Sequence, residues 1–164
     1  MKKTLRYILL FIAATMAAAC SNEGKVIFDQ TVSFENEKWL RQDNKIFNID
    51  VNNVEDCYNI NVKLKIDTSM VRGDQLPLII DLYSENGERR NWRSFVKLRT
   101  KEGNWLCPIE GKYAVADQRI KDYFFFNSKG THRLEIHHGT DRYEIYGVNE
   151  MGVRVVTAKL EYPE

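Results

Sequence analysis

Three histidines, His132, His137 and His138, lie within seven residues and are the first candidates for metal binding. Alternate side chains of a strand share a face, so His137 would lie beside Glu135, while His132 and His138 would share the other face. Glu135 and His137 could supply half of a metal site, but a stable site needs three or four converging ligands. No nearby Asp or His completes that set with a familiar spacing. The pattern favours a solvated strand face with an adjoining turn, and we expect no metal and no other cofactor.

Cys57 and Cys107 are the two cysteines outside the N-terminal segment. In an oxidising compartment they could form a disulfide, which would close a loop of about 50 residues and stabilise the fold by roughly 4 kcal/mol. They could equally be small buried hydrophobic residues, because a sequence does not show whether two Cα atoms approach within the required ~7 Å. A catalytic cysteine needs a base and an orienting group, and no neighbouring residue identifies either.

Carboxylate pairs are a third kind of candidate, because two carboxylates across a cleft would suggest glycoside hydrolysis. The carboxylates concerned are Asp81, Glu85, Asp117 and Asp122. Their places in the chain favour strand ends and turns. No glycine-rich phosphate loop or nucleophile motif is present either, so we expect no catalytic residues.

Aromatic side chains are the remaining candidates for binding. The residues concerned are Trp92, Trp105, Tyr143 and Tyr146. They could form a platform that stacks on a sugar or a peptide, or they could close the ends of a hydrophobic core.

Most of the chain alternates between apolar and polar residues, as a half-buried β-strand does. The alternation is clearest from Tyr58 to Ile66, and Asn86-Gly87 marks a tight hairpin because both residues tolerate positive φ. Further strands are expected at 26–32, 46–51, 76–82, 92–100, 123–126, 131–138 and 153–160, whereas 115–121 could form one or two helical turns. Turn signals recur about every 8 to 12 residues, which predicts an all-β fold: a single antiparallel β-sandwich of the Ig-like or jelly-roll type.

The first twenty residues have the parts of an export signal. Lys2, Lys3 and Arg6 give a positive start, and residues 7–16 form an apolar run shorter than the roughly 20 residues of a membrane span. The small residues before Cys20 resemble the lipobox of bacterial lipoproteins, in which the cysteine receives the lipid. An ordinary secretory signal and an uncleaved anchor are the alternatives.

These signals divide the chain into a removable lipoprotein signal peptide (1–19), the lipidated cysteine with a short polar tether (20–25), and one sandwich domain (26–164). Several acyl chains on Cys20 would hold the protein stably on a membrane, where one chain would not. Ser21, together with a tether that lacks a dense acidic cluster, favours the outer membrane with the domain facing the periplasm.

The charge balance argues against nucleic acid as a partner. The whole chain has 24 Lys plus Arg and 23 Asp plus Glu. Removing Lys2, Lys3 and Arg6 with the signal leaves 21 against 23, a net charge of −2. Nucleic-acid binders need a concentrated basic face, so we expect no nucleic-acid partner.

Several segments occur in an order that resembles a known family. They are Val26-Ile27-Phe28-Asp29, Trp39, Leu76-Pro77-Leu78-Ile79-Ile80-Asp81-Leu82-Tyr83, Gly103-Asn104-Trp105-Leu106, Gly130-Thr131-His132-Arg133-Leu134-Glu135-Ile136, Gly147-Val148 and Met151-Gly152-Val153-Arg154-Val155. This order resembles the GldH family of gliding-motility-associated lipoproteins of Bacteroidota, over nearly the whole mature chain. Cys107 and His137-His138-Gly139 depart from the residues more usual in the family.

The resemblance implies a non-enzymatic lipoprotein of the cell envelope, attached to the membrane through the lipid on Cys20. It further implies an accessory role in gliding motility or the associated secretion apparatus, and it supplies no catalytic residues. We expect envelope proteins as partners, with Trp92, Tyr143 and Tyr146 as the candidate interaction surface. A glycan-binding envelope lipoprotein is the alternative.

Overall fold

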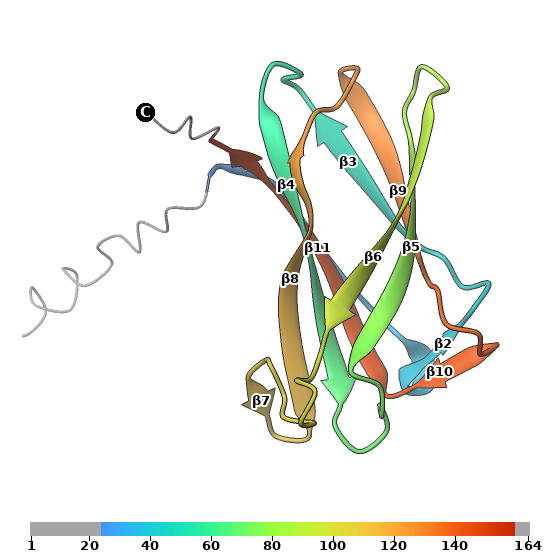
Figure 1. Ribbon diagram of the computed structural model, residues 1–164. Helices are drawn as coiled ribbons and strands as arrows, with labels where there is room; N and C mark the ends of the chain where they lie inside the picture. Colours follow the sequence, from blue (N-terminus) through green and yellow to red (C-terminus); the bar gives the residue numbers. More distant parts are fainter. Residues whose placement is uncertain (1–23, 160–164) are drawn as a thin grey trace, which may run out of the picture.

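The computed structural model describes residues 24–159, which form two antiparallel β-sheets packed face to face and a small third sheet across one end (Figure 1). The five-stranded sheet contains, in order, β1 (Val26–Ser33), β11 (Val148–Ala158), β4 (Cys57–Asp67), β8 (Tyr113–Phe124) and β7 (Ile109–Glu110). The four-stranded sheet contains β3 (Lys45–Val51), β9 (Gly130–His138), β5 (Gln75–Tyr83) and β6 (Arg89–Lys97). The third sheet pairs β2 (Lys38–Leu40) with β10 (Glu144–Tyr146), and the short 3-10 helix η1 (Glu35–Glu37) precedes it.

The strand order is that of a jelly roll, which confirms the predicted all-β sandwich and selects one of its two expected types. If β2, β7 and β10 are set aside, the eight remaining strands, numbered along the chain, have the orders 1-8-3-6 and 2-7-4-5 in the two large sheets. This is the arrangement of two Greek keys that defines a jelly roll. Its open sides lie between β1 and β3 and between β6 and β8.

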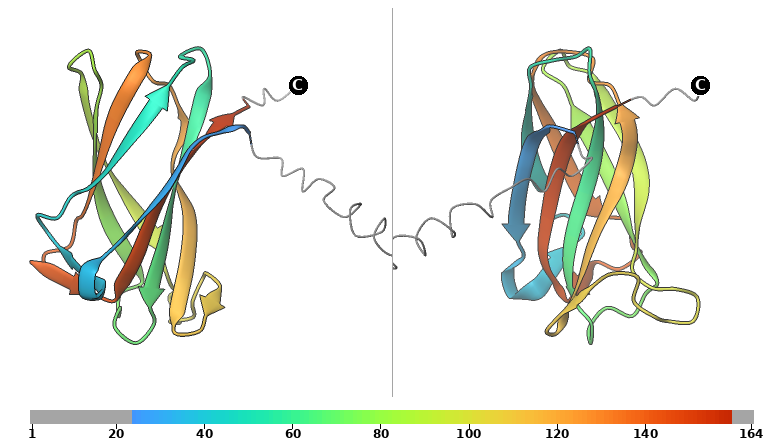
Figure 2. Two further views of the ribbon diagram at one scale, coloured as in Figure 1. Left: turned by 180° about the vertical axis from the view of Figure 1, so that it is seen from behind. Right: turned by 90° about the vertical axis from the view of Figure 1, so that its left-hand side faces the viewer.

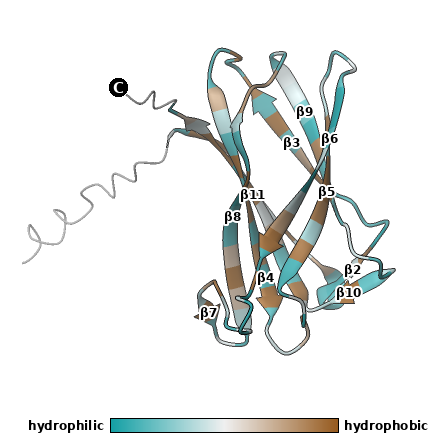
Figure 3. Cartoon of the chain, viewed as in Figure 1, coloured by the Kyte–Doolittle hydropathy of each residue, from teal (hydrophilic) through white to brown (hydrophobic). Residues whose placement is uncertain are grey.

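The alternation seen in the sequence places one face of each long strand between the sheets. Figure 3 shows hydrophobic and hydrophilic bands alternating along the strands. In β4, Leu64 is fully buried and Lys63 is exposed, as the pattern predicts. Leu78 and Ile80 of β5 are fully buried in the opposite sheet. Burial of one such side chain contributes about 1.5–3 kcal/mol, so the strand register is strongly fixed.

Residues 115–121 belong to strand β8, so the helical turns expected there are wrong. Residues such as Ala116 and Gln118 favour helix locally. In the fold, however, β8 pairs with β4 from Tyr113 to Phe124, and Ala116 and Ile120 are buried. Strand preference depends on such neighbours, and here the pairing outweighs the local propensity.

Two of the three clustered histidines are buried, so the solvated surroundings expected for the cluster are wrong for His132 and His138, whereas His137 on the opposite face is partly exposed. His132 and His138 are both fully shielded from solvent on the inward face of β9. The Nε2 of His132 donates a hydrogen bond to the Ser128 carbonyl at 2.8 Å, and its Nδ1 lies 3.0 Å from Ser84 Oγ. A buried imidazole is acceptable here because these partners replace water.

His138 gives the fold a predicted sensitivity to acid. Its ring packs edge-on against Trp39 with 5.4 Å between centroids, and burial, with the nearby charge of Arg41, lowers its pKa from 6.5. Below pH 6.5 the unfolded chain therefore binds a proton that the folded protein does not, so the free energy of unfolding should fall. His138→Phe should flatten this dependence below pH 6.5 in urea unfolding at graded pH. If the free energy of unfolding fell equally steeply with falling pH in the variant and the wild type, His138 would not be the source of the acid sensitivity.

β1 begins and β11 ends at the same end of the sandwich, opposite β2 and β10 (Figure 2). Here the Lys25 N–H donates to Thr157 Oγ1 at 2.8 Å, and the Thr157 N–H donates to the Lys25 carbonyl at 2.9 Å. We call this end the anchor end and the opposite end the distal end. Cys20 and the predicted signal lie outside the described residues, as do residues 160–164. Within residues 24–159, no helix has the length and apolar character needed to cross a membrane.

Candidate functional site

The distal end contains a cavity of about 400 Å³, which we call the distal pocket. One wall is the β4–β5 loop with the start of β5, and the other runs from the turn after β9 through β10 to the start of β11. The lining residues are Met70, Val71, Arg72, Gly73, Gln75, Leu76, Thr140, Arg142, Ile145, Tyr146 and Val148. The volume falls within the range of ligand-binding sites in proteins.

The distal pocket combines apolar surface with unopposed positive charge. Leu76 and Val148 are buried, whereas Tyr146 remains 47% exposed at the rim. The guanidinium groups of Arg72 and Arg142 are exposed, and neither has a hydrogen-bond or ion-pair partner within the described part of the chain. The lining contains no Asp or Glu. The pocket therefore suits a ligand with an apolar part and a negative charge.

Asp67, the last residue of β4, holds the loop that forms one wall. Its Oδ1 accepts hydrogen bonds from the Ser69 N–H at 2.9 Å and from Ser69 Oγ at 2.7 Å. Its Oδ2 lies 2.9 Å from the Nζ of Lys112. The bonds from Ser69, followed by the one from Lys112, lower the pKa of Asp67 to about 2. The loop is thus tied to an ionised carboxylate over the whole physiological pH range.

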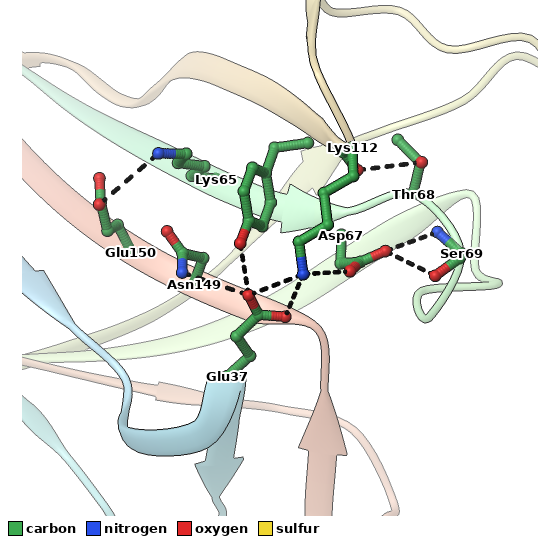
Figure 4. Close-up of polar contacts among 9 residues, drawn as sticks. Glu37, Lys65, Asp67, Thr68, Ser69, Lys112, Asn149 and Glu150 are labelled. Carbon is green, nitrogen blue, oxygen red and sulfur yellow. Dashed lines mark hydrogen bonds and ion pairs between the residues drawn. The ribbon is translucent and has the colours of Figure 1, made fainter.

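Figure 4 shows that Lys112 also connects Asp67 to Glu37 of η1. The Lys112 Nζ lies 3.1 Å from Glu37 Oε1, and the Tyr113 hydroxyl donates to the same oxygen at 2.5 Å. Hydrogen bonds to Asp67 and then Glu37 raise the pKa of Lys112, and the bond from Tyr113 lowers that of Glu37. The backbone of Glu37 is left-handed, with φ of 53°. Such strain persists only where surrounding contacts hold it, and this network supplies them.

Arg99 also holds the β4–β5 loop in place. Its guanidinium lies over the Trp105 ring, 4.1 Å from the centroid, and donates to the Val71 carbonyl at 3.0 Å. Trp105, one of the aromatic candidates from the sequence, is half-buried in this contact. It therefore stabilises the pocket wall.

Gly147 lies where the two walls of the distal pocket meet. Its φ of +87° is left-handed, and a Cβ added there would lie 2.6 Å from the Met70 Cβ. The carbonyl of Gly147 accepts a hydrogen bond from the Asp67 N–H at 2.7 Å. Glycine is thus needed both for the backbone conformation and for the close approach of the loop.

The Asp67 network predicts a specific loss of stability in acid. Because the pKa of Asp67 is about 2 in the folded protein and 3.8 ordinarily, its contribution is fully present above pH 3.8 and is lost as pH falls towards 2. Asp67→Asn should lower the melting temperature at neutral pH. It should also flatten the dependence of melting temperature on pH between pH 3.8 and about 2. Asp29→Asn, at an exposed strand position, is the matched control and should behave as the wild type. Thermal unfolding from pH 2 to 7 would disprove the assignment if Asp67→Asn kept the wild-type slope.

A second concavity of about 530 Å³, which we call the aromatic cleft, lies along the open side between β6 and the end of β8. It is lined by Arg90, Asn91, Trp92, Lys121, Tyr123, Phe124, Phe125, Phe126 and Asn127. Tyr123 and Phe125 are exposed, so the run from 123 to 126 is not the uniformly buried strand expected. Trp92 packs on Phe124 with 6.0 Å between ring centroids. Because Phe124 pairs with Tyr58 at the start of β4, the cleft lies towards the anchor end.

The three aromatic residues expected to form one interaction surface are divided between two places. Tyr146 lines the distal pocket, and Tyr143, which is 59% exposed, lies three residues before it in the chain. Trp92 lies in the aromatic cleft. Arg72 and Arg142, which give the distal pocket its charge, were not among the residues singled out from the sequence.

Cys57 and Cys107 are free cysteines in the structure, so the disulfide alternative is not realised. Cys57 is buried at the start of β4, where its Sγ lies 3.2 Å from the Ala158 carbonyl. Cys107 precedes β7 and lies near the far end of β4, because β7 pairs with the start of β8 and Asp67 pairs with Tyr113. The length of β4 therefore separates the two thiols.

The remaining candidates have ordinary partners. Among residues 24–159, no three His, Cys, Asp or Glu side chains gather as metal ligands would, and Glu135 pairs with Arg133 at 3.1 Å. The four candidate carboxylates contact separate groups: Asp81 contacts Arg89, Asp117 contacts Arg154, Asp122 contacts Arg119, and Glu85 contacts the Thr131 N–H.

Comparison with solved structures finds distant likenesses. A glycoside hydrolase described as a "novel family GH115 4-O-Methyl-alpha-glucuronidase, BtGH115A, with specificity for decorated arabinogalactans" is 15% identical over 89% of this chain, with a TM-score of 0.49. Eiger TNF from S. frugiperda is 12% identical over 87% of this chain and 93% of its own, with a TM-score of 0.38. The infectious bursal disease virus VP2 subviral particle is 13% identical over 88% of this chain and 36% of its own, with a TM-score of 0.39. The chain spans only 19% of the glucuronidase, and scores this low support no argument about function.

Comparison with families gives a firmer result. No curated protein matches the chain. The sequence profile described as GldH lipoprotein, however, matches residues 26–155, which is most of the sandwich and includes both walls of the distal pocket. The resemblance noted from the sequence is therefore confirmed, and the chain belongs to the GldH lipoprotein family.

Proposed function

We propose that this protein is a lipid-anchored accessory component of the bacterial cell envelope that binds a protein partner and catalyses no reaction, in gliding motility or the associated secretion apparatus. Membership of the GldH lipoprotein family supports lipid anchoring. Cys20 would carry the lipid, on the outer membrane with the domain facing the periplasm.

The observation that carries the binding role is the position of the distal pocket relative to the anchor. The β1 strand starts at Val26, so five residues, or six Cα-to-Cα steps, separate Cys20 from the sandwich. At about 3.5 Å per residue this tether spans at most ~21 Å, which keeps the anchor end near the membrane. β4 then extends over eleven residues, roughly 35 Å, to the distal end. This geometry supports presentation of the pocket away from the bilayer, and confinement to a membrane layer would raise its effective concentration for envelope partners.

Site-specific crosslinking in cells tests this function. With p-benzoylphenylalanine at position 146, irradiation should yield one or a few defined envelope-protein adducts, and position 92 in the aromatic cleft should yield fewer. The adducts should be lost with Cys20→Ala, and the same change should abolish incorporation of a palmitate analogue. Normal maturation and labelling of Cys20→Ala would disprove the lipid assignment.

Glycan binding is the second candidate, because the aromatic cleft has features of a sugar-stacking site. Trp92, Tyr123 and Phe125 offer ring surfaces beside the amide side chains of Asn91 and Asn127. A specific ligand on a glycan array that is lost with Trp92→Ala, together with no protein adduct at position 146, would favour this alternative and reject the protein-binding role.

A further inference from the structure

We propose that the distal pocket recognises an acidic segment of its protein partner, with an apolar side chain in the cavity and carboxylates paired to Arg72 and Arg142. This inference rests on the proposed function, because it specifies the partner chemistry at the same site.

The charges of the pocket select an anionic partner. Arg72 and Arg142 approach the cavity from opposite walls, and no carboxylate lines it. Two acidic strand residues close to the lining already have partners. Glu144 of β10 accepts a hydrogen bond from the Tyr146 hydroxyl and lies 3.7 Å from the Nζ of Lys38. Asp67 of β4 is paired with Lys112. The planar fork of arginine matches a carboxylate with two parallel hydrogen bonds, so two such groups favour acidic side chains on both sides of a bound residue.

The apolar part of the pocket is formed before any partner binds. Leu76, Ile145 and Val148 supply aliphatic surface, while Met70 and Tyr146 stand at the rim. Asp67, Arg99 and the close approach at Gly147 fix the loop that carries Met70. A preorganised wall reduces the entropy lost on binding. Tyr, Met and Arg are also the residue types enriched in protein interfaces.

The location of the pocket favours a protein over a lipid headgroup as the source of the negative charge. Anionic headgroups of the anchoring membrane lie beyond the anchor end, and the length of β4, roughly 35 Å, separates that end from the pocket. A segment of a neighbouring envelope protein can reach the distal end without this constraint.

Selection from a display library tests the chemistry without knowledge of the partner. The lipidated full-length protein, reconstituted in phosphatidylcholine nanodiscs, is presented with random heptapeptides. We expect enrichment of Asp and Glu beside aromatic or aliphatic residues, with Lys and Arg depleted. Combined Arg72→Gln and Arg142→Gln should weaken the best selected peptide about tenfold or more. Arg93→Gln, at an exposed position on β6, is the matched control and should bind as the wild type.

The remaining outcomes contradict either the inference or the function on which it rests. Equal recovery of acidic and basic peptides, or unchanged binding by the double variant, would reject the inference. Arginine-dependent retention of phosphatidylglycerol vesicles, with no acidic peptide selected, would assign the site to lipid instead. Crosslinks at position 146 that survive the double variant would reject the inference and leave the proposed function intact. Selection of acidic peptides without any cellular crosslink would reject the proposed function and leave only the binding chemistry of the pocket.

Discussion

Leu64→Ala is expected to lower the free energy of unfolding by about 2–5 kcal/mol. Leu64 is fully buried in the middle of β4, between Met151 of β11 and Ala116 of β8. Truncation leaves a cavity that these neighbouring strands cannot close, because both are held in register on either side. Urea unfolding of the purified protein measures the loss.

Lys63→Ala is the matched control, one residue away on the opposite face of the same strand. Lys63 is exposed, so its replacement should change the free energy of unfolding by no more than about 0.5 kcal/mol. Comparable losses at positions 63 and 64 would show that the register of β4 is wrong.

Gly147→Ala is expected to destabilise the protein by about 2–5 kcal/mol and to alter the distal pocket. A left-handed backbone costs an alanine about 1–2 kcal/mol. The added Cβ would also lie 2.6 Å from the Met70 Cβ, and overpacking of this kind costs about 1–3 kcal/mol more. Thermal and urea unfolding measure the total, and selected peptides should bind the variant more weakly because Met70 must move.

Gly87→Ala separates the two contributions. Gly87 has nearly the same backbone conformation, with φ of +84°, but a Cβ there meets no atom within 4 Å. Gly87→Ala should therefore lose only the roughly 1–2 kcal/mol that a left-handed backbone costs an alanine. If the two alanine variants were equally stable, the close contact between Gly147 and Met70 would be excluded.

The fold could be predicted from the sequence where alternation and burial agree. β4 and β5 follow their predicted ranges closely because each carries an uninterrupted apolar face, and β9 does so because its polar and apolar residues alternate. Residues 115–121 could not be assigned correctly, since their composition favours helix and only the pairing with β4, distant in sequence, makes them a strand. The burial of His132 and His138 was likewise hidden, because their hydrogen-bond partners are revealed only by the fold.

The site was less predictable than the fold. Tyr146 was singled out as an exposed aromatic, but the distal pocket joins residues 70–76 to residues 140–148, and no local pattern connects these segments. Asp67-Thr68-Ser69 is a turn signature in which an Asp side chain bonds the backbone two residues later, and Gly147 indicates an unusual backbone. Both features mark the walls of the pocket. Neither identifies Arg72 and Arg142 as its charges.

The antiparallel pairing of β1 with β11 has a mechanical consequence. A pull between the membrane and a partner held at the distal end would enter the domain at the start of β1 and act along that strand. Ladder hydrogen bonds in an antiparallel pair run perpendicular to the strands, so such a pull loads the bonds between Val26 and Ser33 together, in shear. Peeling them apart one at a time would need a force at right angles to the strand. An attachment through the N-terminal segment would therefore load the domain in the direction in which a β-sheet best resists extension.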